Sequence, residues 1–329
     1  MKTVKRIVSI LLALILLAAG GLWFKCRVID HRSFMAGVAD LVLIVQRRSE
    51  KFRDIDVCER YIAGREQENR EPVVIEKAKF GVSLTEEETG EEGLQAFVYN
   101  AQDSPSVTVF YFHGGAYINQ PNSQQTTMAA RTAAETGAEV VLVVYPKEPV
   151  YTCSYAYESF IRYYTNRISG KDPGKVVFMG DSAGGGLALG LAMELRDRRE
   201  TVPSELVLIS PWVDVTMSDP EMPEYLKNDP MLGIDGCRRM GECWAGELDM
   251  TDPRVSPIYG DVSGDWKVTL TAGTWEVLYP DIMKLYDRFT ESSTECELIV
   301  GERMIHCYPI VPVPEAGPAR EKIWEAVTR

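Results

Sequence analysis

The stretch KVVFMGDSAGGGLALGLAMELRDR, residues 175–198, constrains the fold of this chain more than any other segment. It begins with an apolar run typical of a buried β-strand and ends in a helical segment, 183–198. Between the two, Gly180 and Gly184 flank Ser182 and leave room for a tight turn, because glycine has no Cβ atom to collide there. The sequence therefore predicts a strand, a sharp turn and a helix. This G-x-S-x-G setting exposes the Ser182 hydroxyl at a helix N-terminus, which suits a nucleophile.

The rest of the chain alternates apolar strands with helices in the same way. Near-continuous apolar runs, typical of strands buried on both faces, are 106–112, 139–146, 175–180, 205–212, 267–273 and 295–302. The expected helices are 123–136, 153–168, 183–198, 280–291 and 315–328. Residues 71–84 and 94–100 are expected to form an opening antiparallel pair. Alternation of this kind predicts an α/β fold, with a mostly parallel central sheet and helices on both faces.

One long segment, residues 213–264, interrupts this alternation. Long excursions between neighbouring strands are usually insertions packed over one edge of a sheet. The segment 27–71 is charged and helix-like, and we expect it to form a helical lid together with the insertion. The expected organisation is an N-terminal hydrophobic segment, 1–24, a helical part of the lid, 25–72, and an α/β domain, 73–329, that contains the insertion.

A second glycine-rich motif, HGGAY at 113–117, directly follows the expected strand 106–112. Alone, a glycine pair after a strand is most simply a plain turn. Its place upstream of the Ser182 turn favours another role, in which its backbone N–H groups and that of Ala183 bind a negatively charged oxygen. His113 begins this loop, and we expect its side chain to fix the loop by hydrogen bonding.

The chain has three histidines, so a mechanism that needs a histidine base must use one of them. His31 lies beside the N-terminal apolar segment and is expected at the surface, while His113 belongs to the glycine loop. His306 follows the last expected strand and comes after both Ser182 and the acidic candidates. This is the chain order Ser, Asp or Glu, His, and it favours His306 as the general base.

These motifs resemble those of the α/β-hydrolase fold, and in particular of the hormone-sensitive-lipase-like esterases. That group pairs an HGGG-type motif with GDSAGG, which stand here as HGGA, 113–116, and GDSAGG, 180–185. The stretches SPWVDVT and DPRVSPIYGD, which begin at Ser210 and Asp252, are also similar to the group's sequences. The resemblance covers the chain from about residue 73 to its end.

The resemblance implies an oxyanion hole and a catalytic acid. Gly114 and Gly115 would supply N–H groups to the hole together with Ala183, and Ala116 departs from the pattern where a third glycine stands in the family. The family's acid sits past the penultimate core strand, in text resembling D-P-L-x-D-E. The matching stretch here is EVLYPD, which gives Glu276 the position of the acid.

Two rival acids stay open. Asp281 falls where the motif's trailing acidic residue stands and is expected near the start of the next helix, beside Pro280. Asp214, in SPWVDVT, follows an earlier strand and is the main rival. Glutamate itself is chemically acceptable, because Ser-His-Glu triads occur on this fold.

What the resemblance implies is a serine carboxylic-ester hydrolase that acts on short acyl, acetyl-like esters through an acyl-enzyme. Such chemistry requires no metal and no organic cofactor. A membrane-associated lipase and an amidase or formamidase are alternatives that would use the same triad. A non-catalytic binding protein is the least favoured alternative, because Ser182, Glu276 and His306 are all present.

The net charge and the N-terminal segment indicate which partners and which location to expect. The formal net charge of −13 argues against nucleic acid or an anionic membrane surface as the main partner and does not identify a substrate. The small-molecule ester expected as the partner is what the resemblance implies. Lys2, Lys5 and Arg6 precede an uncharged run, 7–24, whose length is near the lower limit for spanning a bilayer. We expect an uncleaved membrane anchor with the catalytic domain outside the cytoplasm. Secretion after cleavage of a signal segment is the alternative.

Overall fold

A computed structural model of the chain describes residues 2–76, 79–169 and 175–329. Within them, eight strands form one sheet in the order β1-β2-β4-β3-β5-β6-β7-β8. Strand β2 is antiparallel to both of its neighbours, and all other neighbouring pairs are parallel. The strands are β1 (Leu84–Glu87), β2 (Gln95–Tyr99), β3 (Val107–Phe112), β4 (Glu139–Val144), β5 (Lys175–Asp181), β6 (Glu205–Ile209), β7 (Lys267–Gly273) and β8 (Cys296–Gly301). The predicted α/β fold is confirmed.

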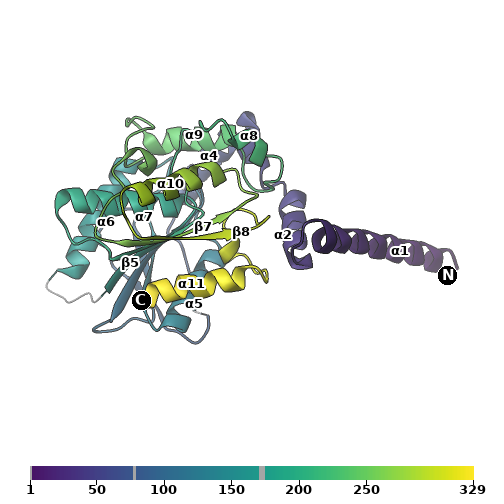
Figure 1. The fold of residues 1–329 in the computed structure, drawn as a ribbon, viewed down its shortest axis with the longest axis horizontal. Helices are drawn as coiled ribbons and strands as arrows, with labels where there is room; N and C mark the ends of the chain where they lie inside the picture. Colours follow the sequence, from purple (N-terminus) through teal and green to yellow (C-terminus); the bar gives the residue numbers. More distant parts are fainter. Residues whose placement is uncertain (1, 77–78, 170–174) are drawn as a thin grey trace.

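Helices cover both faces of this sheet (Figure 1). The central strand β3 shows why its sequence is apolar without alternation. Phe110 and Phe112 pack into the core on one face, and Val109 and Tyr111 pack into the core on the other. The first core is completed by α6 (Cys153–Ile168), α7 (Ala183–Arg198) and α10 (Tyr279–Glu291), and the second by α5 (Ser123–Thr136) and α11 (Ala316–Thr328). The predicted helices correspond to these five.

The opening strand differs from its prediction. Residues 71–76 and 79–83 form no strand, and residues 77–78 lie outside the described residues. Val73 instead exchanges two backbone hydrogen bonds with the side chain of Gln95, at 2.7 and 3.1 Å. The ladder with β2 is made by the next segment, LTEE, which is the polar edge strand β1. An edge strand buries little surface, so its sequence carries no apolar pattern that would reveal it.

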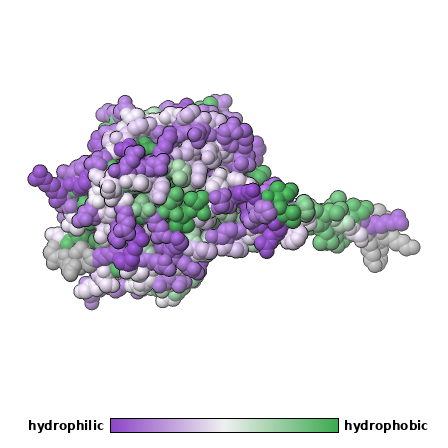
Figure 2. Space-filling view, viewed as in Figure 1, coloured by the Kyte–Doolittle hydropathy of each residue, from purple (hydrophilic) through white to green (hydrophobic). Residues whose placement is uncertain are grey.

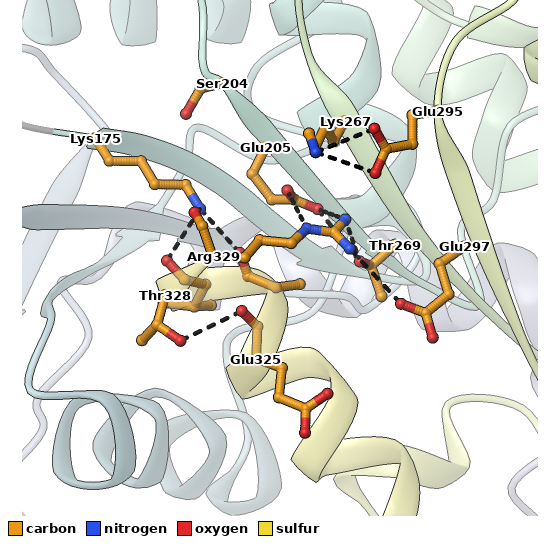
Figure 3. A network of polar contacts seen from close by, with 12 residues as sticks. Lys175, Ser204, Glu205, Lys267, Thr269, Glu295, Glu297, Glu325, Thr328 and Arg329 are labelled. Carbon is orange, nitrogen blue, oxygen red and sulfur yellow. Dashed lines mark hydrogen bonds and ion pairs between the residues drawn. The ribbon is translucent and has the colours of Figure 1, made fainter.

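Charged side chains close the N-terminal edge of the sheet (Figure 3). The guanidinium of Arg329 donates to both carboxylate oxygens of the buried Glu205, at 3.0 and 2.7 Å. The ammonium of Lys175 donates to the carbonyls of Ala326 and Arg329, at 2.9 and 2.7 Å. A cation at the carbonyl end of a helix is favourable, so these contacts fix the C-terminus of α11 beneath the first residues of β5 and β6.

The remaining helices lie mainly over the opposite, C-terminal edge of the strands. They are α2 (Phe34–Val45), α3 (Glu50–Arg53), α4 (Ile55–Arg70), α8 (Met222–Tyr225), α9 (Ile234–Ala245) and two 3-10 turns, Pro257–Tyr259 and Tyr308–Ile310. Helices α3 and α4 pack against α9 from the insertion 213–264. The guanidinium of Arg53 donates to the carbonyls of Leu232 and Asp229, at 3.3 and 2.5 Å. The two segments expected to form a lid are therefore in direct contact.

The first helix, α1 (Lys2–Phe24), projects away from the rest of the molecule and continues into a π-helical turn, Lys25–Ile29 (Figure 1). Apolar residues run along it and onto its junction with the globular part (Figure 2). Among the described residues, one helix is long and apolar enough to cross a membrane, and it covers Arg6–Ile29. Signal segments share this length and composition, so the helix fits either an anchor or a signal.

Candidate active site

Ser182 lies in the sharp turn between β5 and α7. Its φ of 54° and ψ of −123° fall outside the regions that non-glycine residues ordinarily adopt. The turn can form because a Cβ at Gly184 would collide with the Phe112 carbonyl, and one at Gly180 with the backbone of Gly184. The Ser182 side chain is partly exposed at the N-terminus of α7, where the sequence predicts it. Strain of this kind is characteristic of functional sites.

Glu276 and His306 form a buried pair. The Glu276 Oε2 atom lies 2.5 Å from His306 Nδ1, and the two residues are 0% and 2% exposed. His306 Nδ1 therefore donates to the carboxylate, which leaves Nε2 as the nitrogen that can accept a proton. The other oxygen, Glu276 Oε1, accepts the backbone N–H of Gly273 at 2.6 Å. The backbone of its own turn thus orients the Glu276 carboxylate, and the carboxylate orients the His306 imidazole.

Burial alone would lower the pKa of His306, because desolvation disfavours a charged imidazole. The hydrogen bond and the negative charge of Glu276 oppose that effect, and the charges of Asp229 and Asp181 add to them. The net result is a pKa of His306 above the ordinary 6.5. The site therefore stabilises the imidazolium that a general base becomes.

Ser210 joins the acid to the base, and the sequence reasoning missed it. Its hydroxyl donates to Glu276 Oε1 at 2.8 Å and accepts the N–H of Cys307 at 3.1 Å. Ser210 directly follows β6, is fully buried and has a φ of 45°. Its position at the carboxyl end of a core strand was the available signal, because such ends meet at the ligand-binding edge of α/β sheets.

Asp229, from the insertion, supports the same turn and was also missed. It is 1% exposed, and its Oδ2 accepts the N–H of Val277, next to Glu276, at 2.9 Å. Its Oδ1 accepts the N–H groups of Met231 and Leu232, at 2.7 and 2.9 Å. Three N–H donors satisfy the buried carboxylate, which ties the insertion to the segment that carries Glu276. Nothing in the order of the sequence indicates this contact.

The two rival acids lie elsewhere. Asp214 accepts from the N–H and hydroxyl of Thr216, at 2.9 and 2.6 Å, and from the Tyr259 hydroxyl at 2.9 Å. Asp281 lies in the first turn of α10, as the sequence predicts. Burial, together with the charges of Asp214 and Asp219, raises the pKa of Asp281 to about 8. Within the described residues neither carboxylate bonds to His306, and Glu276 does.

The glycine loop corrects one assignment. The N–H of Gly114 donates to Asp181 Oδ1 at 3.1 Å, so it is not free to bind a substrate oxygen as the sequence analysis expects. Among the residues that the structure describes, the N–H groups of Gly115, Ala116 and Ala183 have no hydrogen-bond partner. A Cβ at Gly114 would lie 2.9 Å from the Ser182 Cβ, which places the loop beside the serine. The available donors are therefore Gly115, Ala116 and Ala183.

Asp181 and His113 hold this loop. Besides the Gly114 N–H, the Asp181 carboxylate accepts the Tyr111 hydroxyl at 2.7 Å and Gln125 Nε2 at 2.8 Å. His113 Nδ1 donates to the Gly114 carbonyl at 2.8 Å, and its ring stacks on Tyr145 at 4.6 Å. Burial lowers the pKa of His113 to about 3, with the charge of Lys147 acting in the same direction. A neutral, loop-bound imidazole suits support and not proton transfer.

Ser182 and Cys307, the residue after His306, both contact the end of β6. The Ser182 N–H donates to the Ile209 carbonyl at 2.9 Å, and the thiol of Cys307 contacts the same carbonyl at 3.8 Å. In the described part of the chain the Ser182 hydroxyl has no hydrogen-bond partner, and His306 Nε2 lies 3.4 Å from the Cys307 thiol. The structure thus brings Glu276 and His306 into contact and connects the Ser182 turn to the His306 loop through the Ile209 carbonyl.

An aromatic stack joins the glycine loop to the insertion. Tyr117 stacks on Trp244 of α9 with ring centroids 4.2 Å apart and on Trp212 at 5.5 Å. All three rings are at most 2% exposed. Across the described ranges, no group of three or more His, Cys, Asp or Glu side chains is placed to hold a metal ion.

Fold and site together define a class of protein, the α/β hydrolases with a serine at the strand–helix turn. Residues 109–310, more than half of the chain, match the family described as alpha/beta hydrolase fold, and the chain belongs to that family. A Mycobacterium tuberculosis protein named as an acetyl-hydrolase is 34% identical over 193 residues. That match spans 58% of this chain and 62% of the relative, which is less than two thirds of the relative's length.

Solved structures agree. A Staphylococcus aureus protein described as an esterase has a TM-score of 0.79 at 28% identity, over 86% of this chain and 96% of that one. An esterase from the bacterial hormone-sensitive lipase family has a TM-score of 0.69 at 23% identity, over 82% and 96% of the two chains, and shows the same fold. The resemblance to the α/β-hydrolase fold is confirmed, and so is the prediction of an esterase-type hydrolase at the level of the family.

Proposed function

We propose that the protein is a serine carboxylic-ester hydrolase that uses Ser182, His306 and Glu276 as a catalytic triad. The observation that carries this proposal is the buried contact of 2.5 Å between Glu276 Oε2 and His306 Nδ1, beside a strained serine turn. A buried carboxylate that orients one imidazole nitrogen leaves the other free to act on a serine hydroxyl.

The reaction proceeds in two steps. Ser182 Oγ attacks the ester carbonyl while His306 Nε2 takes its proton, and Glu276 stabilises the resulting imidazolium. The N–H groups of Gly115, Ala116 and Ala183 donate to the oxyanion. The C–O bond to the alcohol then breaks, and His306 returns the proton to the leaving oxygen. Water, deprotonated by His306, attacks the acyl-enzyme, and the acid leaves as Ser182 recovers its proton.

Short acyl esters are the substrates that we propose. The name of the Mycobacterium tuberculosis relative supports acetyl esters. The aromatic stack of Tyr117, Trp212 and Trp244, buried where the glycine loop meets the insertion, supports a confined space near the oxyanion donors. We propose that the segments 25–72 and 213–264 act together as the lid over this space. A lipase that acts on long acyl chains is the second candidate, favoured by the apolar helix α1.

We also propose that α1 is an uncleaved anchor and that the catalytic domain lies outside the cytoplasm. The exposed apolar side chains of α1 support a place in a bilayer, because exposing apolar surface to water is unfavourable. Lys2, Lys5, Arg6 and the amino terminus, set against Lys25, Arg27 and Arg32 on the other side of the apolar run, support slightly an N-terminal end that stays in the cytoplasm.

The direct test is hydrolysis of p-nitrophenyl acetate by the Ser182→Ala variant. We expect turnover to fall by at least about 10³-fold, because the nucleophile is lost while binding remains. Ser169→Ala is the matched control, since Ser169 is exposed at the end of α6, and it should leave turnover unchanged. Unchanged turnover in Ser182→Ala would rule out the mechanism.

The substrate class needs a panel. Esters from acetyl to palmitoyl separate the proposed short-chain esterase, which should lose activity beyond short chains, from a lipase, which should gain it. A matched anilide in place of the ester separates ester from amide hydrolysis.

A further inference from the structure

Helix α2 is apolar on the side that faces away from the protein. Its sequence is FMAGVADLVLIV, with Asp40 as its single charged residue. Its exposed apolar side chains are Met35 at 48%, Leu41 at 48%, Val42 at 46%, Ile44 at 60% and Val45 at 72%. Met35, Val42 and Val45 follow helical spacing and share one face, on which Val38 is half-buried. Leu41 and Ile44 are exposed to one side of this face. A soluble monomer does not normally leave so continuous an apolar helix face in water.

The opposite face of α2 is the one that packs on the protein. Ala36 is 1% exposed and joins a small core with Met304 and Tyr308. Asp40 forms an ion pair with the buried Arg32. The helix is therefore docked on one side, and its exposed residues are not a consequence of a loose end.

Helix α2 lies across the end of α1 instead of continuing it (Figure 1). Gly37 makes this crossing possible, because a Cβ there would collide with the Cys26 thiol and approach Leu22 Cδ1 to 3.2 Å. Cys26 is fully buried at the crossing. If α1 spans a bilayer, a helix that crosses its end runs along the bilayer surface.

Basic side chains flank the apolar face at both ends. Lys25 and Arg27 are exposed between α1 and α2, and Arg47 and Arg48 are exposed just after α2. Cations at the two ends of an apolar helix are placed for lipid headgroups, while the apolar side chains enter the region of the acyl chains. This pattern favours lipid over a second protein chain as the occupant of the face.

The segment that links α1 to α2 is docked on the loops that carry the acid and the base. The Arg32 guanidinium stacks on the ring of Trp275, next to Glu276, at 4.1 Å from its centroid, and donates to the Arg303 carbonyl at 3.2 Å. Arg303 returns a hydrogen bond to the Ile29 carbonyl at 2.9 Å. The exposed face of α2 and the catalytic edge of the sheet are thus parts of one rigid arrangement.

We infer that α2 lies in the interface of the bilayer that α1 spans, with Met35, Val42 and Val45 toward the acyl chains. This arrangement sets the edge of the sheet that bears Glu276 and His306 beside the membrane surface, so that the site receives esters that partition into the bilayer. The inference rests on the proposed anchoring by α1.

The test uses the full chain in vesicles of phosphatidylcholine and phosphatidylglycerol, with the photo-crosslinker p-benzoylphenylalanine at one position at a time. Val45 probes α2 and Leu14 probes α1. Val74 is the matched control, because it is a valine that is 78% exposed and lies near β1, at the opposite edge of the sheet. After irradiation, mass spectrometry measures adducts of one phospholipid. We expect lipid adducts in similar yield at positions 45 and 14 and no lipid adducts at position 74.

The outcomes separate the inference from the proposals beneath it. Adducts at 14 without adducts at 45 overturn the place of α2 and leave the anchor intact. If neither position gives adducts, the place of α2 and the anchoring by α1 are both overturned. The Ser182 chemistry is tested separately, on water-dissolved esters. A protein–protein adduct at 45 shows that a second copy covers the face and overturns the assignment to lipid.

A second variant tests the consequence for the site. The double substitution Val42→Asp and Val45→Asp changes two exposed side chains and leaves the docked face intact. We expect unchanged turnover of water-dissolved p-nitrophenyl acetate and a severalfold loss of turnover for the acetate ester of a long-chain alcohol carried in the vesicles. Equal turnover of the vesicle-borne ester by the variant and the parent would contradict the arrangement.

Discussion

The side chain of Glu276 is one methylene longer than that of aspartate, and its own turn takes up the extra length. Glu276 Oε1 returns to the Gly273 N–H at 2.6 Å while Oε2 reaches His306 at 2.5 Å. The Ser210 hydroxyl fills a further acceptor position of Oε1 at 2.8 Å. Each bond to the buried carboxylate restricts its rotation, so the imidazole meets an acceptor that is already oriented.

Replacing Glu276 by glutamine tests the acid. The amide keeps the shape of the carboxylate but cannot stabilise an imidazolium, so kcat for p-nitrophenyl acetate should fall by about 10³- to 10⁴-fold. Asp281→Asn is the control, because Asp281 is an equally buried acid in the next helix that does not bond to His306. Retention of most activity in Glu276→Gln, or a comparable loss in Asp281→Asn, would reject the assignment.

The pH profile follows from the raised pKa of His306. A general base must be neutral, so kcat/KM should fall as pH decreases through the pKa of His306 in the free enzyme. Because Glu276 raises that pKa above 6.5, the acidic limb should lie above 6.5. In Glu276→Gln the residual activity should show its limb at lower pH. Initial rates on a soluble ester from pH 5 to 9 measure both, and an unmoved limb would contradict the coupling.

Asp281 gives a separate prediction, for stability. Its pKa is raised by burial and by neighbouring carboxylates from 3.8 to about 8, so the folded state holds its proton more tightly than the unfolded chain. A raised pKa adds stability that is complete below pH 3.8 and is lost as pH rises toward 8. The free energy of unfolding, from urea titrations, should therefore decline less over this range in Asp281→Asn. An identical decline in both proteins would contradict the prediction.

At the residue scale the sequence predicts the groups that follow chain order and misses those that need three dimensions. Ser182, Glu276 and His306 stand in motif and order positions, and the structure brings the last two into contact. Ser210 and Asp229 reach the Glu276 turn from other segments, and only folding reveals them. The Gly114 N–H was expected to bind the oxyanion, but it donates to Asp181. A motif does not show which N–H group a buried aspartate will accept.

Among the elements, the glycine loop after β3 is the most sensitive to added volume. A Cβ at Gly114 would lie 2.5 Å from Asp181 Oδ2 and 2.7 Å from the Asp181 carbonyl, so the loop or the serine turn must move. Gly114→Ala should reduce turnover strongly and lower the free energy of unfolding by about 1–3 kcal/mol. A Cβ at Gly317 in α11 meets no atom within 4 Å, so Gly317→Ala should keep turnover and stability or improve stability slightly. Equal effects of the two substitutions would contradict this prediction.

Elements that bury an apolar pattern are predictable, and those that bury little are not. Helices α5, α6 and α7 begin and end at the predicted residues, because capping, glycine and apolar spacing all act locally. Strand β1 was expected on the apolar run 71–84, but the ladder falls on the polar residues Leu84–Glu87. The register of an edge strand is set by its partner and not by its own composition.

At the scale of the whole molecule, the segment 25–49 packs as part of the α/β domain. A chain that begins at Lys25 keeps the Arg32 stack on Trp275 and the hydrogen bond of 2.8 Å from the Ser33 hydroxyl to Glu315. In mild detergent it should unfold near the temperature of the full chain and hydrolyse soluble esters at a similar rate. A chain that begins at Glu50 uncovers Trp275 and the core around Met304, and should unfold at a clearly lower temperature.

Thermal unfolding and p-nitrophenyl acetate turnover, measured on both shortened chains, check this prediction. Equal stability of the two would show that the segment 25–49 is only a spacer.

The sequence could not predict this docking. It indicates an apolar helix at 7–24 and a helical segment after it, because both patterns are local. The contacts that join Arg32 to Arg303 and Ser33 to Glu315 span 271 and 282 residues, and a single sequence carries no signal for pairs so far apart.

Helix α11 has a consequence for the order in which the molecule is made. It packs against β3, β6 and β7 and, with Ile323, Ala326 and Val327, closes the core beneath Val109 and Ile209. A ribosome delivers β3 about 200 residues before it delivers this helix, since β3 begins at Val107 and α11 at Ala316. The part of this face that α11 covers therefore stays open until translation is nearly complete, whereas α5, which follows β3 directly, can cover its own part early. The growing chain carries this apolar surface until then, and both faces of the sheet are fully covered only after synthesis has nearly finished.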